Sequence, residues 1–202
     1  MVRSPCPAAS PTRRQARDRS GGGKAVVRRT AGSSALKKWF AALLAVSLSG
    51  LPVSAAEPLA GRASVVDGDT IDIGKVRVRL HGVDAPESRQ LCADRNGNTY
   101  RCGREAAFAL DRFLAAARPT RCELVDRDRY GRVVGVCFRA DGVNVNRWLV
   151  ENGHALDWPR YSKGAYAGAQ RAAQVSGFGI WQGAFQKPCE VRAERTGQRV
   201  AC

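Results

Sequence analysis

The stretch "VVDGDTIDIGKVRVRLHGVDAPE", from Val65 to Glu87, has the pattern of two short strands joined by a tight turn. In its centre, "IDIGKVRVRL" alternates apolar and polar residues on both sides of Gly74-Lys75, which is the signal of a two-residue β-hairpin. A turn at these two residues places Thr70 opposite Arg79. The Asp69 end of the first strand therefore lies beside Arg79 on the second, and we expect opposite charges to meet at one end of the hairpin.

More acids follow at the same end of the hairpin. Asp84 and Glu87 come just after the second strand, where Pro86 turns the chain. Acids and arginines would coexist there if they bound different ends of one ligand, a metal-bound phosphate. Carboxylates bind a hard cation through oxygen, and arginines bind phosphate oxygens through forked hydrogen bonds. The alternative is a set of surface ion pairs, each worth about 0–1 kcal/mol.

The positive charge of the chain is concentrated near its N-terminus. The formal net charge of the 202 residues is +15, and residues 1–56 hold ten Lys/Arg and one acid. Residues 57–202 hold 23 Lys/Arg against 17 acids, so their net charge is only +6. A moderately basic body of this kind is compatible with a polyanionic partner but is weak evidence for one.

Two N-terminal segments precede the predicted domain. Residues 1–36 are rich in Pro, Ser, Gly and Arg, and we expect a disordered basic leader. Residues 37–56 begin with two lysines, continue with an uncharged, mostly apolar run and end in "VSAA", which is the order of a secretory signal. The run is short for a membrane-spanning helix, and Pro52 interrupts it. The prediction is export to the periplasm or medium, with an uncleaved membrane anchor as the alternative.

The cysteines agree with export. Of the seven, Cys6 precedes the signal, and an even six remain, which allow 15 disulfide connectivities. One pair is favoured by geometry, because a hairpin turning at Arg129-Tyr130 would place its two flanking cysteines opposite each other. The other two pairs would close a loop containing "NGN" and tie the tail. Buried thiols or a zinc site are the alternatives, although the chain has no CxxC pair and only two histidines. The favoured pairs are Cys122 with Cys137, Cys92 with Cys102, and Cys189 with Cys202.

The remaining elements complete an α+β pattern. Residues 103–119 have apolar residues at helical spacing, and a hairpin is predicted for residues 121–139. Further helices are expected in residues 141–155 and 161–181, and the tail beyond Phe185 is expected to be irregular. Three strands, a helix, two strands and two helices match a five-stranded OB-fold β-barrel with three helices.

Three motifs in register carry a resemblance to a known family. "VVDGDTI", "RVRLHGVDAPE" and "DRDRYGRVVG" occur in this order, and "GIW" follows at residues 179–181. Together they resemble the staphylococcal nuclease (thermonuclease) family over residues 62–188, which leaves residues 189–202 as a C-terminal tail. The resemblance implies an OB-fold phosphodiesterase that cleaves DNA and RNA with calcium.

The resemblance also implies roles for individual residues. Asp69 and Asp84 match the carboxylate ligands of calcium, and Ala85 matches a residue that contributes its backbone carbonyl. Arg79 and Arg132 match the arginines that bind the scissile phosphate. The remaining matches are Glu87 to the residue that activates or positions the attacking water, Asp67 to an acid that supports the metal site, and Tyr130 and Tyr161 to substrate-binding aromatics.

Alternative roles remain open for two of these residues, because Asp67 could cap the turn at Gly68 and Tyr130 could pack within its hairpin. The sequence predicts an exported, calcium-dependent nuclease acting on DNA, RNA or both. No protein partner is predicted, and the membrane is a partner only if residues 37–56 stay uncleaved. The alternative function is an OB-fold module that binds single strands through a basic groove and aromatics without chemistry.

Overall fold

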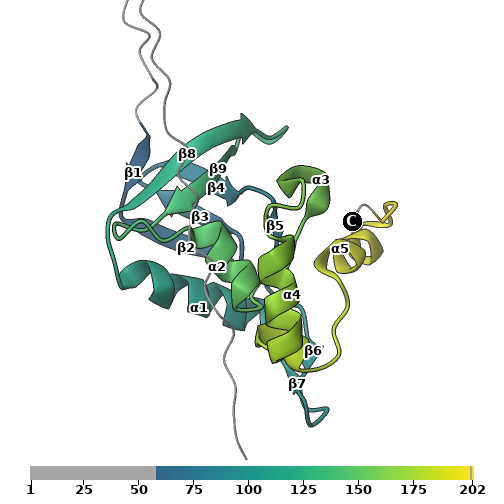
Figure 1. Cartoon of the computed structure of the whole chain (residues 1–202). Coiled ribbons are helices and arrows are strands. Elements are labelled where there is room, and N and C mark those ends of the chain that lie inside the picture. Colours follow the sequence, from purple (N-terminus) through teal and green to yellow (C-terminus); the bar gives the residue numbers. More distant parts are fainter. Residues whose placement is uncertain (1–57, 201) are drawn as a thin grey trace, which may run out of the picture. The chain divides into compact units, whose positions relative to one another are not determined.

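The computed structural model describes residues 58–200 and 202 (Figure 1). The predicted leader, residues 1–36, and the predicted signal or anchor, residues 37–56, lie outside the described residues. Within the described part of the chain, no helix is both long enough and apolar enough to cross a membrane. The elements are β1 (Leu59–Gly61), β2 (Ala63–Asp67), β3 (Thr70–Ile73), β4 (Val76–Leu80), β5 (Val83–Asp84), β6 (Cys92–Ala93), β7 (Thr99–Tyr100), α1 (Cys102–Ala115), β8 (Thr120–Arg127), β9 (Val133–Phe138), α2 (Val145–Glu151), β10 (Leu156–Asp157), α3 (Pro159–Ser162), α4 (Ala167–Ser176), the 3₁₀-helix η1 (Gly179–Gln182) and α5 (Pro188–Thr196).

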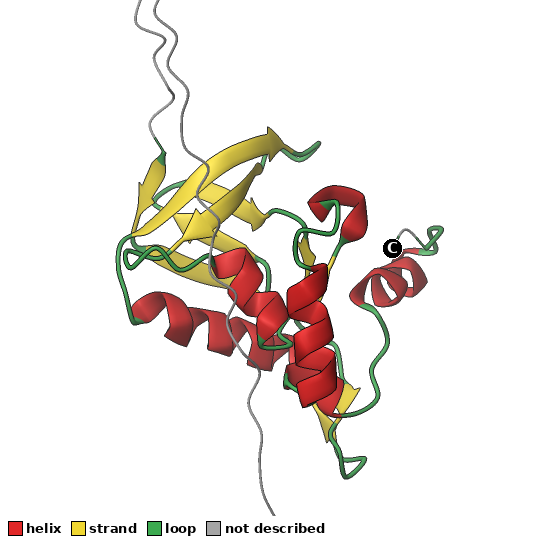
Figure 2. Cartoon of the chain, viewed as in Figure 1, coloured by secondary structure: helices red, strands yellow, loops and turns green. Residues whose placement is uncertain are grey.

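The described chain is α+β, as predicted, with its helices gathered to one side of the main sheet (Figure 2). The sheet differs from the predicted closed five-stranded barrel. It has six strands in the hydrogen-bonded order β1-β8-β9-β4-β3-β2, and two short two-stranded sheets accompany it. The additional strand arises because the chain is interrupted at Arg62. Its first part, β1, pairs with β8, and its second part, β2, pairs with β3.

Both predicted hairpins are confirmed. The turn at Gly74-Lys75 joins β3 to β4, and Thr70 lies opposite Arg79 as the alternation required. The β8–β9 hairpin places Cys122 opposite Cys137. Strand β4 continues the sheet by pairing in parallel with β9, which sets Arg79 beside Val134.

The helices depart from the prediction in two places. The helix expected over residues 161–181 is divided into α3, α4 and η1, because Lys163 and Gly177 adopt the left-handed conformation and end α3 and α4. The tail expected to be irregular contains α5. Its helix begins with Pro188, which suits a first helical turn, and ends at Gly197 in the left-handed conformation.

The core lies between the β3–β4 hairpin and the helices that cover it. Ile71, Val78 and Leu80 are fully buried and pack in one cluster with Leu110 of α1 and Leu149 of α2. The face of β4 that carries Val78 and Leu80 is the apolar face predicted from the alternation. Arg79, on the opposite face of the strand, is thereby directed away from the core.

All three predicted disulfides are present, joining Cys92 to Cys102, Cys122 to Cys137 and Cys189 to Cys202. They exclude zinc-bound or free thiols at these six positions in the described structure. Three disulfides in a chain of this size are typical of proteins that fold in an oxidising compartment.

Removing the Cys122–Cys137 bridge is expected to lower the melting temperature. The bridge spans 15 residues of sequence and joins two buried cysteines. Closing a loop of this size contributes about 3 kcal/mol, which corresponds to roughly 6–12 °C for a domain of this length. Circular dichroism of Cys122→Ala/Cys137→Ala, with a thiol assay of the parent, measures the effect. Free thiols in the parent, or equal melting temperatures, would contradict the prediction.

A second stability prediction concerns His154, which follows α2. Burial and the charge of Arg112 lower the pKa of its imidazole to about 4. Because the unfolded chain then binds more protons between about pH 6.5 and pH 4, the free energy of unfolding should decrease as the pH falls through this window, by up to about 1.4 kcal/mol per pH unit. Urea unfolding at several pH values should show a shallower dependence in His154→Gln. An identical slope in parent and variant would refute this account.

Candidate active site

A glycine lets the β2–β3 turn approach the segment that follows β5. A Cβ atom on Gly68 would lie 2.7 Å from the Cβ of Ala85, so a larger residue would push the two segments apart. The side chain of Asp67 closes the turn by accepting a hydrogen bond from the backbone N–H of Asp69 at 3.1 Å. Asp67 therefore caps the turn. Asp69 in turn accepts a hydrogen bond from the backbone N–H of Ala85 at 3.1 Å, which fixes the two predicted ligand segments side by side.

Backbone packing also positions Asp84 and Glu87. Asp84 belongs to β5 and pairs with Leu156 of β10. The backbone N–H of Glu87 donates to the side chain of Gln90 at 3.0 Å. Helix α1 begins directly against this turn, where a Cβ on Gly103 would lie only 1.8 Å from the carbonyl oxygen of Glu87. Both acids are thus held by main-chain contacts that do not depend on their own side chains.

Arg79 joins the two predicted metal ligands. Its Nη1 lies 2.8 Å from Oδ1 of Asp69, and its Nη2 lies 3.6 Å from Oδ1 of Asp84. Both carboxylates are buried, with 4% and 3% of their residue surface exposed. The guanidinium carbon of Arg79 also lies 5.8 Å from the ring centre of Trp158. The sequence prediction that these charges meet at one end of the hairpin is confirmed.

Burial is the largest of the influences on the pKa of Asp69. Burial raises the pKa of its carboxyl to about 7, with the nearby acids Asp67 and Asp84 acting in the same direction. Arg79 and the N–H of Ala85 oppose this rise. A buried carboxylate in this environment is stabilised by any cation that comes within contact distance.

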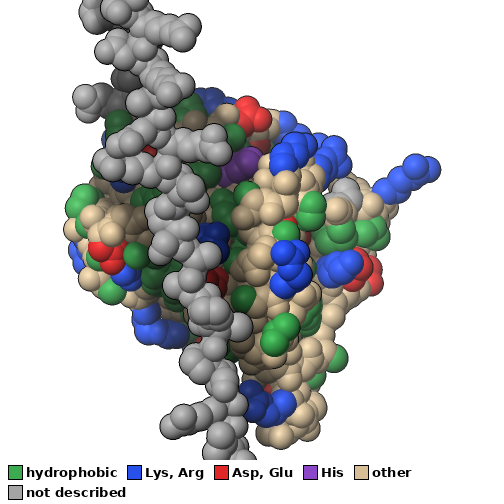
Figure 3. All heavy atoms as spheres, viewed as in Figure 1, with side chains coloured by type: hydrophobic (Ala, Val, Ile, Leu, Met, Phe, Trp, Pro, Cys, Tyr) green, Lys and Arg blue, Asp and Glu red, His purple; other side chains and the backbone are tan. Residues whose placement is uncertain are grey.

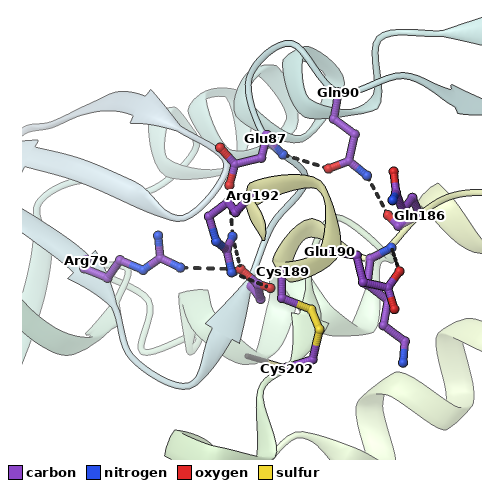
Figure 4. The surroundings of a disulfide bond; sticks show 10 residues. Arg79, Glu87, Gln90, Gln186, Cys189, Glu190, Arg192 and Cys202 are labelled. Atoms are coloured by element: carbon purple, nitrogen blue, oxygen red, sulfur yellow. Dashed lines mark hydrogen bonds and ion pairs between the residues drawn. A yellow bond between two sulfur atoms is a disulfide. The ribbon is translucent and has the colours of Figure 1, made fainter. Parts of the chain in front are cut away.

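Helix α5 contributes a second arginine to the acids, which the sequence did not predict. Arg192 Nη1 lies 2.7 Å from Oδ1 of Asp84 and 2.9 Å from Oε1 of Glu87, and its Nη2 lies 3.0 Å from Oδ2 of Asp84 (Figure 4). Burial alone would lower the pKa of Arg192, but its hydrogen bonds to Asp84 and Glu87 and the charges of these acids have the larger effect and raise the pKa. Arg195 lies 3.4 Å from the other carboxylate oxygen of Glu87.

Among the described contacts, Arg132 and Tyr130 have partners other than the acids. The guanidinium of Arg132 is bonded to Asp128 at 2.6 Å, and its described ion pair is with that residue rather than with Asp69, Asp84 or Glu87. Arg132 and the exposed Tyr130 line a cavity of about 740 Å³ beside the β3–β4 turn. The full lining is Asp72, Gly74, Lys75, Val76, Arg77, Arg127, Tyr130, Gly131 and Arg132.

Tyr161 lies on α3, the short helix that follows Trp158. Its ring is 4.7 Å from that of Trp158, which itself contacts both Arg79 and Arg192. Lys and Arg side chains gather on the side of the visible face that carries the β8–β9 turn, α3 and α5 (Figure 3). Aromatic and basic groups therefore flank the buried acids on this side of the molecule.

The donor atoms at this site fit a hard divalent cation. Asp69 and Asp84 are oxygen donors close enough to share one guanidinium, and the adjacent Ala85 adds a backbone carbonyl to the segment. Within residues 58–200 and 202, no group of three or more His, Cys, Asp or Glu side chains converges as a metal cage. Two carboxylates suit an ion that keeps part of its oxygen shell for water and substrate phosphate.

Comparison with known proteins identifies the family of the chain. The family model "Staphylococcal nuclease homologue" matches residues 77–183. The chain belongs to this family. The match includes Arg79, Asp84, Glu87 and Arg132, and it ends before α5 begins. Family membership supports an OB-fold of the α+β class and indicates nuclease activity.

Three curated relatives extend the comparison. A succinoglycan biosynthesis protein, ExoI, from Rhizobium meliloti (strain 1021) is 52% identical over 169 residues, which cover 84% of this chain and 88% of that protein. An uncharacterized endonuclease from Escherichia coli is 33% identical over 61% of this chain and 77% of its own length. A micrococcal nuclease from Shigella flexneri is 30% identical over 58% of this chain and 70% of its own length.

Proposed function

We propose that the chain is a calcium-dependent nuclease that hydrolyses phosphodiester bonds of DNA and RNA. The observation that carries the proposal is the contact of one guanidinium, that of Arg79, with both Asp69 and Asp84. A cationic fork beside two buried oxygen donors is the arrangement that a metal-bound phosphate requires.

Asp69, Asp84 and the backbone carbonyl of Ala85 would hold the calcium ion. When bound, the ion supplies positive charge that offsets the negative charge of the scissile phosphate. Asp67 supports this site indirectly, because its cap on the β2–β3 turn fixes the backbone of Asp69. The three aspartates thus bind and orient the ion, and the groups that act on the phosphate and the water are Arg79, Glu87 and Arg132.

Arg79, Glu87 and Arg132 would carry out the reaction. Arg79 binds the phosphate and stabilises the charge that develops in the transition state. Glu87 positions the attacking water and accepts its proton. Arg132 would turn from Asp128 toward a phosphate, since it lies on the chain just before β9, the strand that pairs with the strand of Arg79.

The aromatic and basic surroundings would bind the rest of the nucleic acid. Tyr130 and the basic residues of the 740 Å³ cavity are suited to a phosphate backbone and a stacked base. Tyr161 offers a second exposed aromatic face, 46% exposed, next to Trp158. We infer that the protein acts after export, consistent with three disulfides, and that it is membrane-tethered only if residues 37–56 remain uncleaved.

The alternative function is a module that binds nucleic acid without cleaving it. Such a module would require the basic and aromatic surface but not the buried acids beside Arg79. Both functions are tested by incubating the purified protein with plasmid DNA and with single-stranded RNA, in calcium and in excess chelator. The proposal expects cleavage only with calcium. Binding without cleavage would favour the alternative, and cleavage in excess chelator would exclude the metal role.

A further inference from the structure

We propose that α5 is a built-in inhibitor of the site, in which the guanidinium of Arg192 occupies Asp84, a proposed ligand of the divalent cation, together with Glu87, the proposed proton acceptor. The inference rests on the proposed function, because it assigns a competitor to the proposed cation site. Its expected consequence is that calcium and the helix exclude each other.

Each carboxylate oxygen of Asp84 and Glu87 is faced by a guanidinium nitrogen of α5. The fork of Arg192 covers both carboxylate oxygens of Asp84, at 2.7 and 3.0 Å, and one oxygen of Glu87, at 2.9 Å. Arg195 faces the second oxygen of Glu87 at 3.4 Å. In this arrangement a metal ion approaching Asp84 meets the positive charge of Arg192, and the guanidinium groups of Arg192 and Arg195 compete with water for the oxygens of Glu87. The contacts that hold α5 in place therefore oppose the proposed roles of both acids, metal binding by Asp84 and proton acceptance by Glu87.

The way α5 packs indicates that it can be displaced. Its buried residues are only Pro188, Cys189 and Ala193, all small, so the helix buries little apolar surface. A cavity of about 560 Å³ borders the helix at Cys189 and is lined on its other side by aromatic residues, including Trp158. Polar contacts thus provide much of the attachment, and a competing cation can replace them.

Two links keep α5 formed and close to the acids. Gln90, whose side chain positions Glu87, also donates to the backbone carbonyl of Gln186 at 2.7 Å, just before the helix (Figure 4). The Cys189–Cys202 disulfide joins the first turn of the helix to the last residue of the chain. A helix of nine residues is marginal by itself in water. The disulfide therefore presents Arg192 on a preformed helix.

Calcium affinity measures the competition directly. When a site is open for only a fraction of the time, its apparent dissociation constant is raised by the inverse of that fraction. If α5 covers the acids about nine-tenths of the time, opening the site tightens apparent binding about tenfold. The probe is calcium chloride, titrated by calorimetry into the full chain without nucleic acid.

Three variants separate competition from simple loss of charge. Arg192→Gln removes the guanidinium that occupies Asp84, and this variant is expected to bind calcium about tenfold more tightly than the parent. Arg195→Gln removes an equal charge from the same helix. Because the side chain of Arg195 is 66% exposed and exposed ion pairs contribute little, we expect its calcium affinity to change by less than about threefold. Cys189→Ser/Cys202→Ser keeps every charge and loosens the helix, and it too should bind calcium more tightly. Circular dichroism confirms that each variant is folded.

Each outcome decides the proposal. Tighter binding in Arg192→Gln and in the cysteine variant, without a matching change in Arg195→Gln, supports the inhibitor. Equal or weaker binding in Arg192→Gln overturns it and leaves Arg192 as a further phosphate-binding arginine. Equal tightening in the two arginine variants overturns it as well, since charge alone would then account for the effect. If neither parent nor variants bind calcium, the proposed cation site itself fails and the inhibitor fails with it.

Discussion

Replacing Arg79 with lysine is expected to lower kcat/KM for nucleic acid cleavage by about 10³-fold. Arg79 reaches Asp69 and Asp84 with two different nitrogens of one planar group, and a lysine ammonium cannot reproduce this fork. In related phosphoryl-transfer reactions an arginine of this kind contributes roughly 10³–10⁵-fold to the rate. The measurement is cleavage of a fluorogenic oligonucleotide at saturating calcium.

The matched control is Arg121→Lys. Arg121 lies on β8 and forms an ion pair with Glu123 at 2.6 Å, in which both side chains are about half exposed. The same chemical change there should alter kcat/KM less than about threefold, because exposed ion pairs contribute little. Melting curves of both variants show whether folding is retained. A well-folded Arg79→Lys with near-parent activity would exclude Arg79 from the reaction.

Local patterns predicted the elements whose signals are contained in a few adjacent residues. The hairpin register, with Thr70 opposite Arg79, follows from a period of two around Gly74-Lys75. The Cys122–Cys137 pair follows from the symmetry of a second hairpin. In both cases one turn fixes the position of every residue along the two strands, so local information is sufficient.

Other features depend on residues far apart in the sequence. The first strand divides at Arg62 because its two parts pair with different strands, which no local pattern reveals. Helix α5 did have local signals, with Pro188 at its start, Glu190 in its first turn and Gly197 at its end. The polar composition of the tail conceals these signals, because it offers few apolar residues at helical spacing.

The residues of the candidate site also divide into those with local sequence signals and those that only the fold brings together. Asp69, Asp84 and Glu87 lie in short motifs, and the structure brings them together around Arg79 and Arg192. Arg192 lies more than 100 residues from both acids that it contacts, so only the fold reveals its position. The motif around Arg132 predicts a phosphate-binding role for this residue. In the structure its guanidinium forms an ion pair with Asp128, four residues earlier in the chain.

Replacing Glu87 with glutamine is expected to lower the cleavage rate by at least about 10²-fold while leaving calcium binding intact. The carboxylate is the group that we propose to accept a proton from water once the site is open, and loss of a general base costs about 10²–10⁴-fold. Glutamine has nearly the same size, and the hydrogen bond between the backbone of Glu87 and Gln90 does not involve the altered atoms, so the fold should be retained.

Calcium calorimetry alongside single-turnover cleavage separates Glu87 from the metal ligands. Asp84→Asn should weaken calcium binding, whereas Glu87→Gln removes one partner of Arg192 and should leave the affinity equal or tighter. Glu151→Gln, at the exposed end of α2, is the control for the substitution itself and should match the parent in both measurements. Near-parent turnover in a folded Glu87→Gln would remove this residue from the reaction. A parallel loss of calcium affinity would instead make it a ligand.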